Sequence, residues 1–178
     1  MAMVSAALAW AQDAPPAVGD LAPEFELPAL AAGHMLSLAE HRGAVVYLEF
    51  WNSFCAPCRA SFPKLDALRR RLPREDFEVI AVNMDRFADD ARRFLEDTPV
   101  SFPVVSDASL LTGRRFGVNV LPTGFLLDRA GVIRDIHQGE FDMARFGARV
   151  AELIGHPQKH SRKDAPTASS SATNKRPF

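Results

Sequence analysis

Along residues 20–155, apolar and polar positions repeat with two periods, one typical of strands and one typical of helices. Two short alternating segments flank an Ala-Ala-Gly turn and predict a hairpin. Two longer, nearly continuous apolar runs are typical of strands buried on both faces of a sheet. The strands that these patterns predict are 25–27, 35–38, 45–51, 77–83, 103–105, 124–128 and 132–137.

Helical spacing, with apolar residues three or four positions apart, separates several of these strands. Pro57 falls in the first turn of the first helix, where a missing N–H costs nothing, whereas Pro63 lies inside it and should kink it. The early strand–helix–strand order demands a parallel crossover, and the late strand pair adds antiparallel strands. We therefore expect an α/β fold, a mixed central β-sheet with helices on both faces. The expected helices are 56–72, 88–96, 109–116 and 141–154.

Composition and charge limit the possible functions. The chain has 178 residues, 47% of them hydrophobic and 24% charged, which suits one ordinary globular domain. The net charge is -1, but residues 156–178 carry five Lys or Arg against one Asp. The remaining part is therefore acidic, and a nucleic-acid partner is not expected because such proteins place positive charge on the folded domain.

The two ends of the chain differ from the middle. Residues 1–11 are small and apolar and end in Ala9-Trp10-Ala11, the pattern of a signal-peptide cleavage site, although no Lys or Arg precedes them. We expect export to the bacterial periplasm, the alternative being an unstructured N-terminal arm. Residues 12–19 form a Pro-rich lead-in to a domain spanning 20–155. Residues 156–178 are polar and basic and predict a disordered tail.

The only cysteines are Cys55 and Cys58, two residues apart. A structural zinc site needs four ligands, and the one close histidine pair, His156 and His160, lies in the polar tail. We therefore expect no metal and no other cofactor. The two thiols are spaced so that they can close on each other as a reversible disulfide.

The cysteines lie where a buried strand ends and a helix begins. Unpaired N–H groups and the positive end of the helix dipole at this junction favour a thiolate at Cys55 and lower its pKa. Cys58, one turn further in, should be more buried. Cys55 is then the attacking nucleophile and Cys58 the resolving thiol. The alternative is a permanent disulfide, but so short a loop would stabilise the fold little.

The segment Val-Val-Tyr-Leu-Glu-Phe-Trp-Asn-Ser-Phe-Cys-Ala-Pro-Cys-Arg at 45–59 resembles the active-site segment of thioredoxin-fold proteins. The following Ser-Phe-Pro, the N-terminal hairpin and the inserted helix near 88–96 are similar to the TlpA/ResA-like branch. A second motif at 116–123, Phe-Gly-Val-Asn-Val-Leu-Pro-Thr, agrees with this resemblance. The resemblance spans about residues 20–155 and implies a thioredoxin-like fold and thiol–disulfide oxidoreductase activity.

The resemblance also implies roles for individual residues. Pro122 matches a cis-proline that faces the cysteine pair, and Leu121 before it would offer backbone groups to an extended substrate. Trp51 resembles the aromatic residue that packs under the disulfide. Phe54 stands where the family usually has Trp. The residues expected to take part in substrate binding are Leu121, Pro122, Trp51, Phe54, Ala56 and Pro57.

Glu49 is a carboxylate inside an apolar strand, where desolvation would raise its pKa. It aligns with the buried acid of thioredoxins, so we interpret it as the general acid/base for Cys58. The alternative is a strand-end carboxylate that reaches water. Many relatives involved in cytochrome maturation carry Glu three residues after the second cysteine, where this chain has Ser61. This departure favours a general reductase over a dedicated cytochrome c maturation role.

The function that the sequence predicts is an exported thiol–disulfide reductase acting as a monomer. Its expected partners are an oxidised client protein and a membrane thiol electron donor. Ala56 and Pro57 resemble the Gly-Pro of reducing thioredoxins, which indicates a reducing potential. Two alternatives stay open, a thiol peroxidase, although no Pro-x-x-x-Thr/Ser-x-x-Cys context precedes Cys55, and a non-catalytic copper or haem chaperone.

Overall fold

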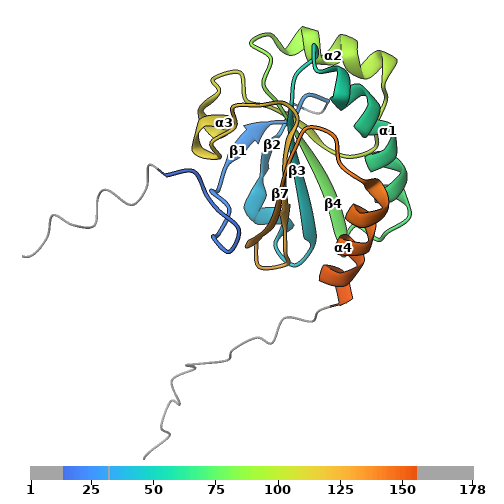
Figure 1. The fold of residues 1–178 in the computed structure, drawn as a ribbon. Coiled ribbons are helices and arrows are strands. Elements are labelled where there is room, and N and C mark those ends of the chain that lie inside the picture. Colours follow the sequence, from blue (N-terminus) through green and yellow to red (C-terminus); the bar gives the residue numbers. More distant parts are fainter. Residues whose placement is uncertain (1–13, 32, 156–178) are drawn as a thin grey trace, which may run out of the picture.

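A computed structural model of the protein describes residues 14–31 and 33–155 (Figure 1). The expected signal peptide and basic tail lie outside this part of the chain. The strands are β1 (Glu26–Pro28), β2 (Met35–Ser37), β3 (Val45–Trp51), β4 (Phe77–Asn83), β5 (Val104–Ser106), β6 (Thr123–Leu127) and β7 (Ile133–Gln138). The helices are the 3-10 helix η1 (Leu38–His41), α1 (Ala56–Arg70), α2 (Ala88–Asp97), α3 (Leu111–Arg115) and α4 (Met143–Gly155).

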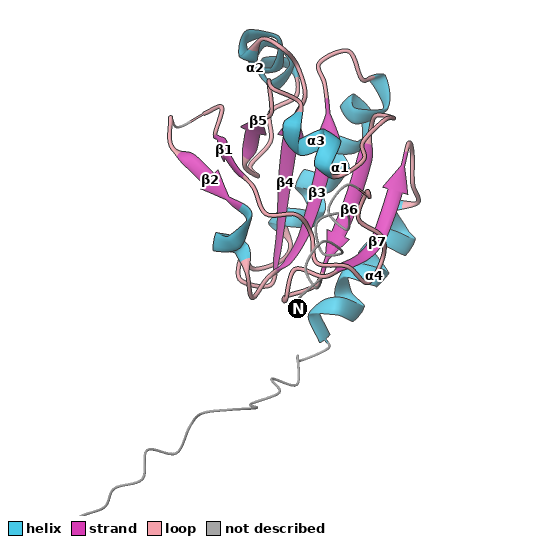
Figure 2. Ribbon diagram, turned by 90° about the vertical axis from the view of Figure 1, so that its left-hand side faces the viewer, coloured by secondary structure: helices cyan, strands magenta, loops and turns pink. Residues whose placement is uncertain are grey.

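Five strands form the central sheet in the order β5-β4-β3-β6-β7 (Figure 2). The strands β3, β4 and β5 are parallel, whereas β6 and β7 run antiparallel to their neighbours. This confirms the predicted mixed sheet. The hairpin β1–β2 forms a separate two-stranded sheet, joined to β5 by a bridge between Ala29 and Val105. In this register Glu49 lies between Ala81 of β4 and Gly124 of β6.

The alternation of side chains along β3 divides the interior into two apolar cores, because successive residues of a strand point to opposite faces. One face packs against α1, α2 and α4, through residues such as Phe62, Phe94 and Phe146. The other face packs against the hairpin segment and Phe116, which follows α3. Figure 1 shows α1 and α4 on one side of the sheet and α3 with β1 and β2 on the other. Both cysteines belong to the first core.

The structure differs from the predicted elements mainly at their ends. The closing helix begins at Met143 rather than at 141, because the Asp142 carboxylate accepts hydrogen bonds from the N–H groups of Ala144 and Arg145 and caps it. The helix α3 is shorter than expected and follows Leu110, whose φ of 60° is left-handed. The 3-10 helix η1 has no counterpart among the predicted elements. No helix within the described ranges is long and apolar enough to span a bilayer.

Candidate active site

Cys55 and Cys58 form a disulfide at the junction between β3 and α1, with their Cα atoms 5.3 Å apart. Cys55 is the N-cap residue of α1, and its Sγ accepts a hydrogen bond from the Cys58 N–H at 3.3 Å. Cys55 is 8% exposed and Cys58 is 0% exposed. The helix dipole and this N–H stabilise negative charge on the outer sulfur. The arrangement therefore makes Cys55 the accessible member of the pair.

The turn before Cys55 is held by a buried carboxylate from another strand end. Asp85 follows β4, and its Oδ2 and Oδ1 accept hydrogen bonds from the Ser53 N–H at 2.9 Å and the Ser53 Oγ at 3.0 Å. The Asn83 side chain donates a further bond to Asp85 Oδ2 at 2.8 Å. The approach to the cysteines is thus tied to the neighbouring parallel strand. No pattern in the sequence pointed to Asp85, because the contact depends on the strand pairing.

Glu49 lies in the middle of β3 and is completely buried, which excludes the alternative of a carboxylate reaching water. Burial raises its pKa to about 7, while a hydrogen bond from the Ser61 side chain lowers it. The Ser61 Oγ lies 2.7 Å from Glu49 Oε1 and 3.1 Å from the Cys58 carbonyl oxygen. Glu49 Oε2 is buried and has no hydrogen-bond partner among the described residues. The carboxyl group is therefore held close to the Cys58 backbone, with a proton affinity suited to exchange near neutral pH.

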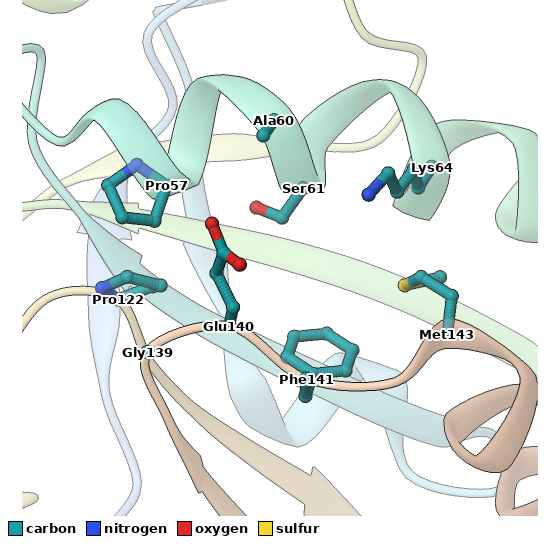
Figure 3. A pocket seen from close by; sticks show the side chains of 9 residues that line it. All are labelled: Pro57, Ala60, Ser61, Lys64, Pro122, Gly139, Glu140, Phe141 and Met143. Carbon is teal, nitrogen blue, oxygen red and sulfur yellow. The ribbon is translucent and has the colours of Figure 1, made fainter.

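The Leu121–Pro122 peptide bond is cis, as the resemblance implied. Pro122 and Pro57 line the same pocket beside the start of α1 (Figure 3). The second loop that lines this pocket runs from Gly139 to Phe141, and the Gly139 N–H donates to the Pro122 carbonyl at 2.8 Å. Sequence reasoning did not single out this loop, because no motif marks it.

The remaining residues expected to bind substrate differ in exposure. Phe54 is 85% exposed directly before Cys55, Ala56 is exposed, and Leu121 and Pro57 are half-buried. Trp51 requires a correction, because its side chain is 0% exposed and packs against Phe62 and Phe94 in the core. A direct contact between Trp51 and a substrate is not available in this structure. Trp51 instead belongs to the apolar cluster that contains both cysteines.

A Cys-x-x-Cys disulfide at the start of the first helix, beside a mixed five-stranded sheet, defines a thioredoxin-fold thiol–disulfide oxidoreductase. A family model described as Redoxin matches residues 17–149. The chain therefore belongs to the redoxin family, in its TlpA/ResA-like branch.

Individual relatives agree with this assignment. The thiol-disulfide oxidoreductase ResA of Geobacillus kaustophilus is 34% identical over 123 residues, 69% of this chain and 70% of that protein. The thioredoxin-like protein YneN of Bacillus subtilis is 33% identical over 124 residues, 68% of this chain and 71% of that protein. Among solved structures, a protein described as the thiol:disulfide interchange protein DsbE of Chlorobium tepidum is 37% identical, with a TM-score of 0.74. That match covers 78% of this chain and 99% of the other.

Proposed function

We propose that this enzyme is an exported reductase of protein disulfides. The observation that carries the proposal is the asymmetry of the cysteine pair. Cys55, the N-cap residue of α1, keeps 8% of its surface exposed, whereas Cys58 is 0% exposed. The Ser61 hydroxyl links the Cys58 carbonyl to the buried Glu49. An accessible nucleophile and a shielded second thiol with a nearby acid are the parts that a two-step exchange requires.

The proposed reaction starts from the dithiol form. The Cys55 thiolate attacks one sulfur of a client disulfide, forms a mixed disulfide, and releases the other client sulfur as a thiolate that takes up a proton. Glu49 then accepts the proton of Cys58, whose thiolate attacks the Cys55 sulfur and releases the second client thiol. Two electrons pass to the client, and the enzyme is left with the Cys55–Cys58 disulfide. A thiol donor, proposed to be membrane-bound, restores the dithiol.

Three features support the client, the direction and the location. Phe54 and the half-buried Leu121 offer apolar contact and backbone groups near Cys55 to an extended client segment. The residues between the cysteines are Ala56 and Pro57, so no His is present there to stabilise the thiolate further, which favours a reductase. The apolar residues 1–11 support export to the periplasm. We further propose that the disulfide is the only redox centre and that the protein acts as a monomer.

Insulin reduction by dithiothreitol, with and without the full chain, tests this function. The wild-type protein should accelerate insulin precipitation, and Cys55→Ser should abolish the acceleration. Cys58→Ser should trap a mixed disulfide on Cys55, because the resolving thiol has been removed. Mass spectrometry of the trapped species identifies the sulfur involved. If iodoacetamide labels Cys58 before Cys55 in the reduced protein, the two roles are wrongly assigned.

The same preparation discriminates between the alternatives. A reductase should be active after metal removal with a chelator, whereas a copper chaperone would bind Cu(I) tightly and leave insulin unchanged. A thiol peroxidase would turn over hydrogen peroxide with Cys55 as the oxidised residue. Turnover of peroxide at a rate above that of insulin reduction would replace the proposed function by the peroxidase.

A further inference from the structure

The Ser61 hydroxyl lies between two acceptors that compete for its single hydrogen. Its Oγ is 2.7 Å from Glu49 Oε1 and 3.1 Å from the carbonyl oxygen of Cys58. A serine hydroxyl donates one hydrogen bond at a time, although its oxygen can accept others. Ser61 therefore has two stable orientations, one directed to the carboxyl group and the other to the backbone of the resolving cysteine.

Glu49 depends on this hydroxyl in both of its protonation states. Its other oxygen, Oε2, is buried without a partner among the described residues. When Glu49 is ionised, Ser61 donates to Oε1 and forms a charge-assisted hydrogen bond. When Oε1 is protonated, Glu49 becomes the donor to Ser61 Oγ, and Ser61 turns its hydrogen to the Cys58 carbonyl. Neither state leaves the Ser61–Glu49 contact without a hydrogen bond.

Ser61 also connects the buried carboxyl group to the surface. Glu49 is completely buried, but Ser61 is only half-buried and lines the pocket formed by α1, Pro122 and the loop before α4. Figure 3 shows the side chains of Ser61 and Glu140 pointing into this pocket from opposite walls. A proton that leaves Glu49 thus has an adjacent hydroxyl that faces the pocket.

The other titratable and charged groups on this side of the sheet come from several elements. Burial raises the pKa of Tyr47, the neighbour of Glu49 on the same face of β3, and the negative charge of Glu49 raises it further. The strands on either side of Glu49 present Ala81 and Gly124, neither of which is charged. Other titratable or charged groups on this side are Cys58, Arg59, Lys64 and Asp66 on α1, His137 on β7, Glu140 and Asp142 before α4, and Arg145 on α4.

We propose that Ser61 is a positioning residue of the resolving step, a hydroxyl that turns between Glu49 Oε1 and the Cys58 carbonyl and passes the Glu49 proton to the pocket. This role rests on the proposed function, since it requires Glu49 to accept a proton from Cys58. After Cys58 attacks Cys55, the Ser61 hydroxyl turns its hydrogen from the Cys58 carbonyl to water in the pocket. Ser61 Oγ then takes the carboxyl proton of Glu49 as it gives its own hydrogen to that water. The carboxylate is then ready for another cycle, and no electrons move in this step.

Stopped-flow reaction of the reduced full chain with excess 5,5′-dithiobis(2-nitrobenzoate) separates the two chemical steps. The first thionitrobenzoate is released by attack of Cys55 and the second by resolution through Cys58. The wild-type resolution rate should rise with pH through about 7, the pKa to which burial raises Glu49, because only the ionised carboxylate accepts the thiol proton.

Ser61→Ala should move the midpoint of this profile upward by about one pH unit, because the bond that favours the ionised carboxylate is gone. It should also slow resolution at pH 7, while attack by Cys55 changes little. Ser61→Thr keeps a hydroxyl and should restore the wild-type profile. In a Glu49→Gln background, Ser61→Ala should have no further effect on the profile, because the two residues act as one unit.

A matched control is available on the opposite end of the same helix. Ser101 Oγ donates to the buried carboxylate of Asp66 on α1 at 2.6 Å, away from the cysteines, so Ser101→Ala also removes a serine–carboxylate bond at this helix. Asp66 keeps the Ser101 N–H and Arg70 as partners. It should leave the resolution profile unchanged. A direct second readout is the infrared carboxyl band of Glu49 in the oxidised protein, where neither cysteine titrates.

The outcomes separate this inference from the proposed function. If the wild-type protein does not reduce insulin, or if Glu49→Gln leaves the resolution profile intact, the proposed function or its use of Glu49 is wrong. If both hold but Ser61→Ala leaves the midpoint and the infrared titration in place, or Ser101→Ala shifts the midpoint equally, the role of Ser61 is refuted.

Discussion

At the scale of single residues, the fold works against the ionisation of Glu49. The side chain is 0% exposed and only one of its oxygens has a hydrogen-bond partner among the described residues. Its pKa rises from 4.5 to about 7 because burial disfavours the charged form. The folded protein therefore binds this proton more tightly than the unfolded chain between these two pH values. The raised pKa lowers the stability of the folded protein at neutral and higher pH. It also gives the site an acid that changes charge near neutral pH.

This shift predicts how stability depends on pH. Between about pH 4.5 and 7 the folded state holds more protons than the unfolded state, so the contribution of Glu49 falls as the pH rises and is constant above 7. The total change is about 3 kcal/mol for a shift of this size. In the oxidised protein, where the cysteines do not titrate, Glu49→Gln should remove this fall and be more stable than the wild type at pH 8.

Urea unfolding of both proteins at several pH values measures this difference. Other titrating groups, such as His41 and His137, are present in both proteins and largely cancel when the two free energies of unfolding are subtracted. A difference that is the same at pH 4 and pH 8 would contradict a raised pKa at Glu49.

At the scale of elements, the helix that carries both cysteines is fixed to the sheet by a buried ion pair. Arg69 near the end of α1 donates to Glu78 of β4 at 2.6 Å, and the two residues are 5% and 3% exposed. Arg74, in the loop between them, reaches the second Glu78 oxygen at 2.7 Å, but its side chain is 58% exposed. The ion pair thus links the active-site helix to β4, and Arg69 compensates the buried negative charge of Glu78.

Removing the two arginines should have unequal effects. Arg69→Met should lower the free energy of unfolding by about 3 kcal/mol, because it leaves Glu78 buried without its inner partner. Arg74→Met, the matched control, should cost about 1 kcal/mol or less because solvent screens the exposed partner. Denaturant unfolding measures both. Equal losses would show that burial of the Arg69–Glu78 pair does not determine its contribution.

At the scale of the whole molecule, the sequence was most informative where one residue pattern determines the local structure. The apolar run at 45–51 places β3, and the two cysteines that follow it must then fall at the helix start. Glu49 stood out because a carboxylate interrupts that run. The two strands around Gly131 were also predictable, since a turn joins them directly.

Features that depend on distant segments could not be predicted in the same way. The hydrogen bond from Ser61 to Glu49 depends on how α1 is oriented on the sheet, which brings position 61 next to β3. The sequence showed only that Ser stands where many relatives have Glu. Asp85 reaches Ser53 across 32 residues because β3 and β4 are parallel neighbours. Trp51 was expected both under the disulfide and in contact with substrate. Its place in the core with the two cysteines agrees with the first expectation, but Phe62 of α1 and Phe94 of α2 cover it and leave no exposed surface for a substrate.

The reduction potential of the Cys55–Cys58 pair tests the central claim most directly. Equilibration of the full chain with glutathione or dithiothreitol buffers, followed by alkylation and mass spectrometry, measures it. Reducing thioredoxins have reduction potentials of about -270 mV, and strong oxidants of the DsbA type have potentials of about -120 mV. We predict a reduction potential of roughly -220 to -280 mV, since no His lies between the cysteines and the buried Glu49 is linked to Cys58 through Ser61. A reduction potential of about -120 mV would make this protein an oxidant of thiols and contradict the account.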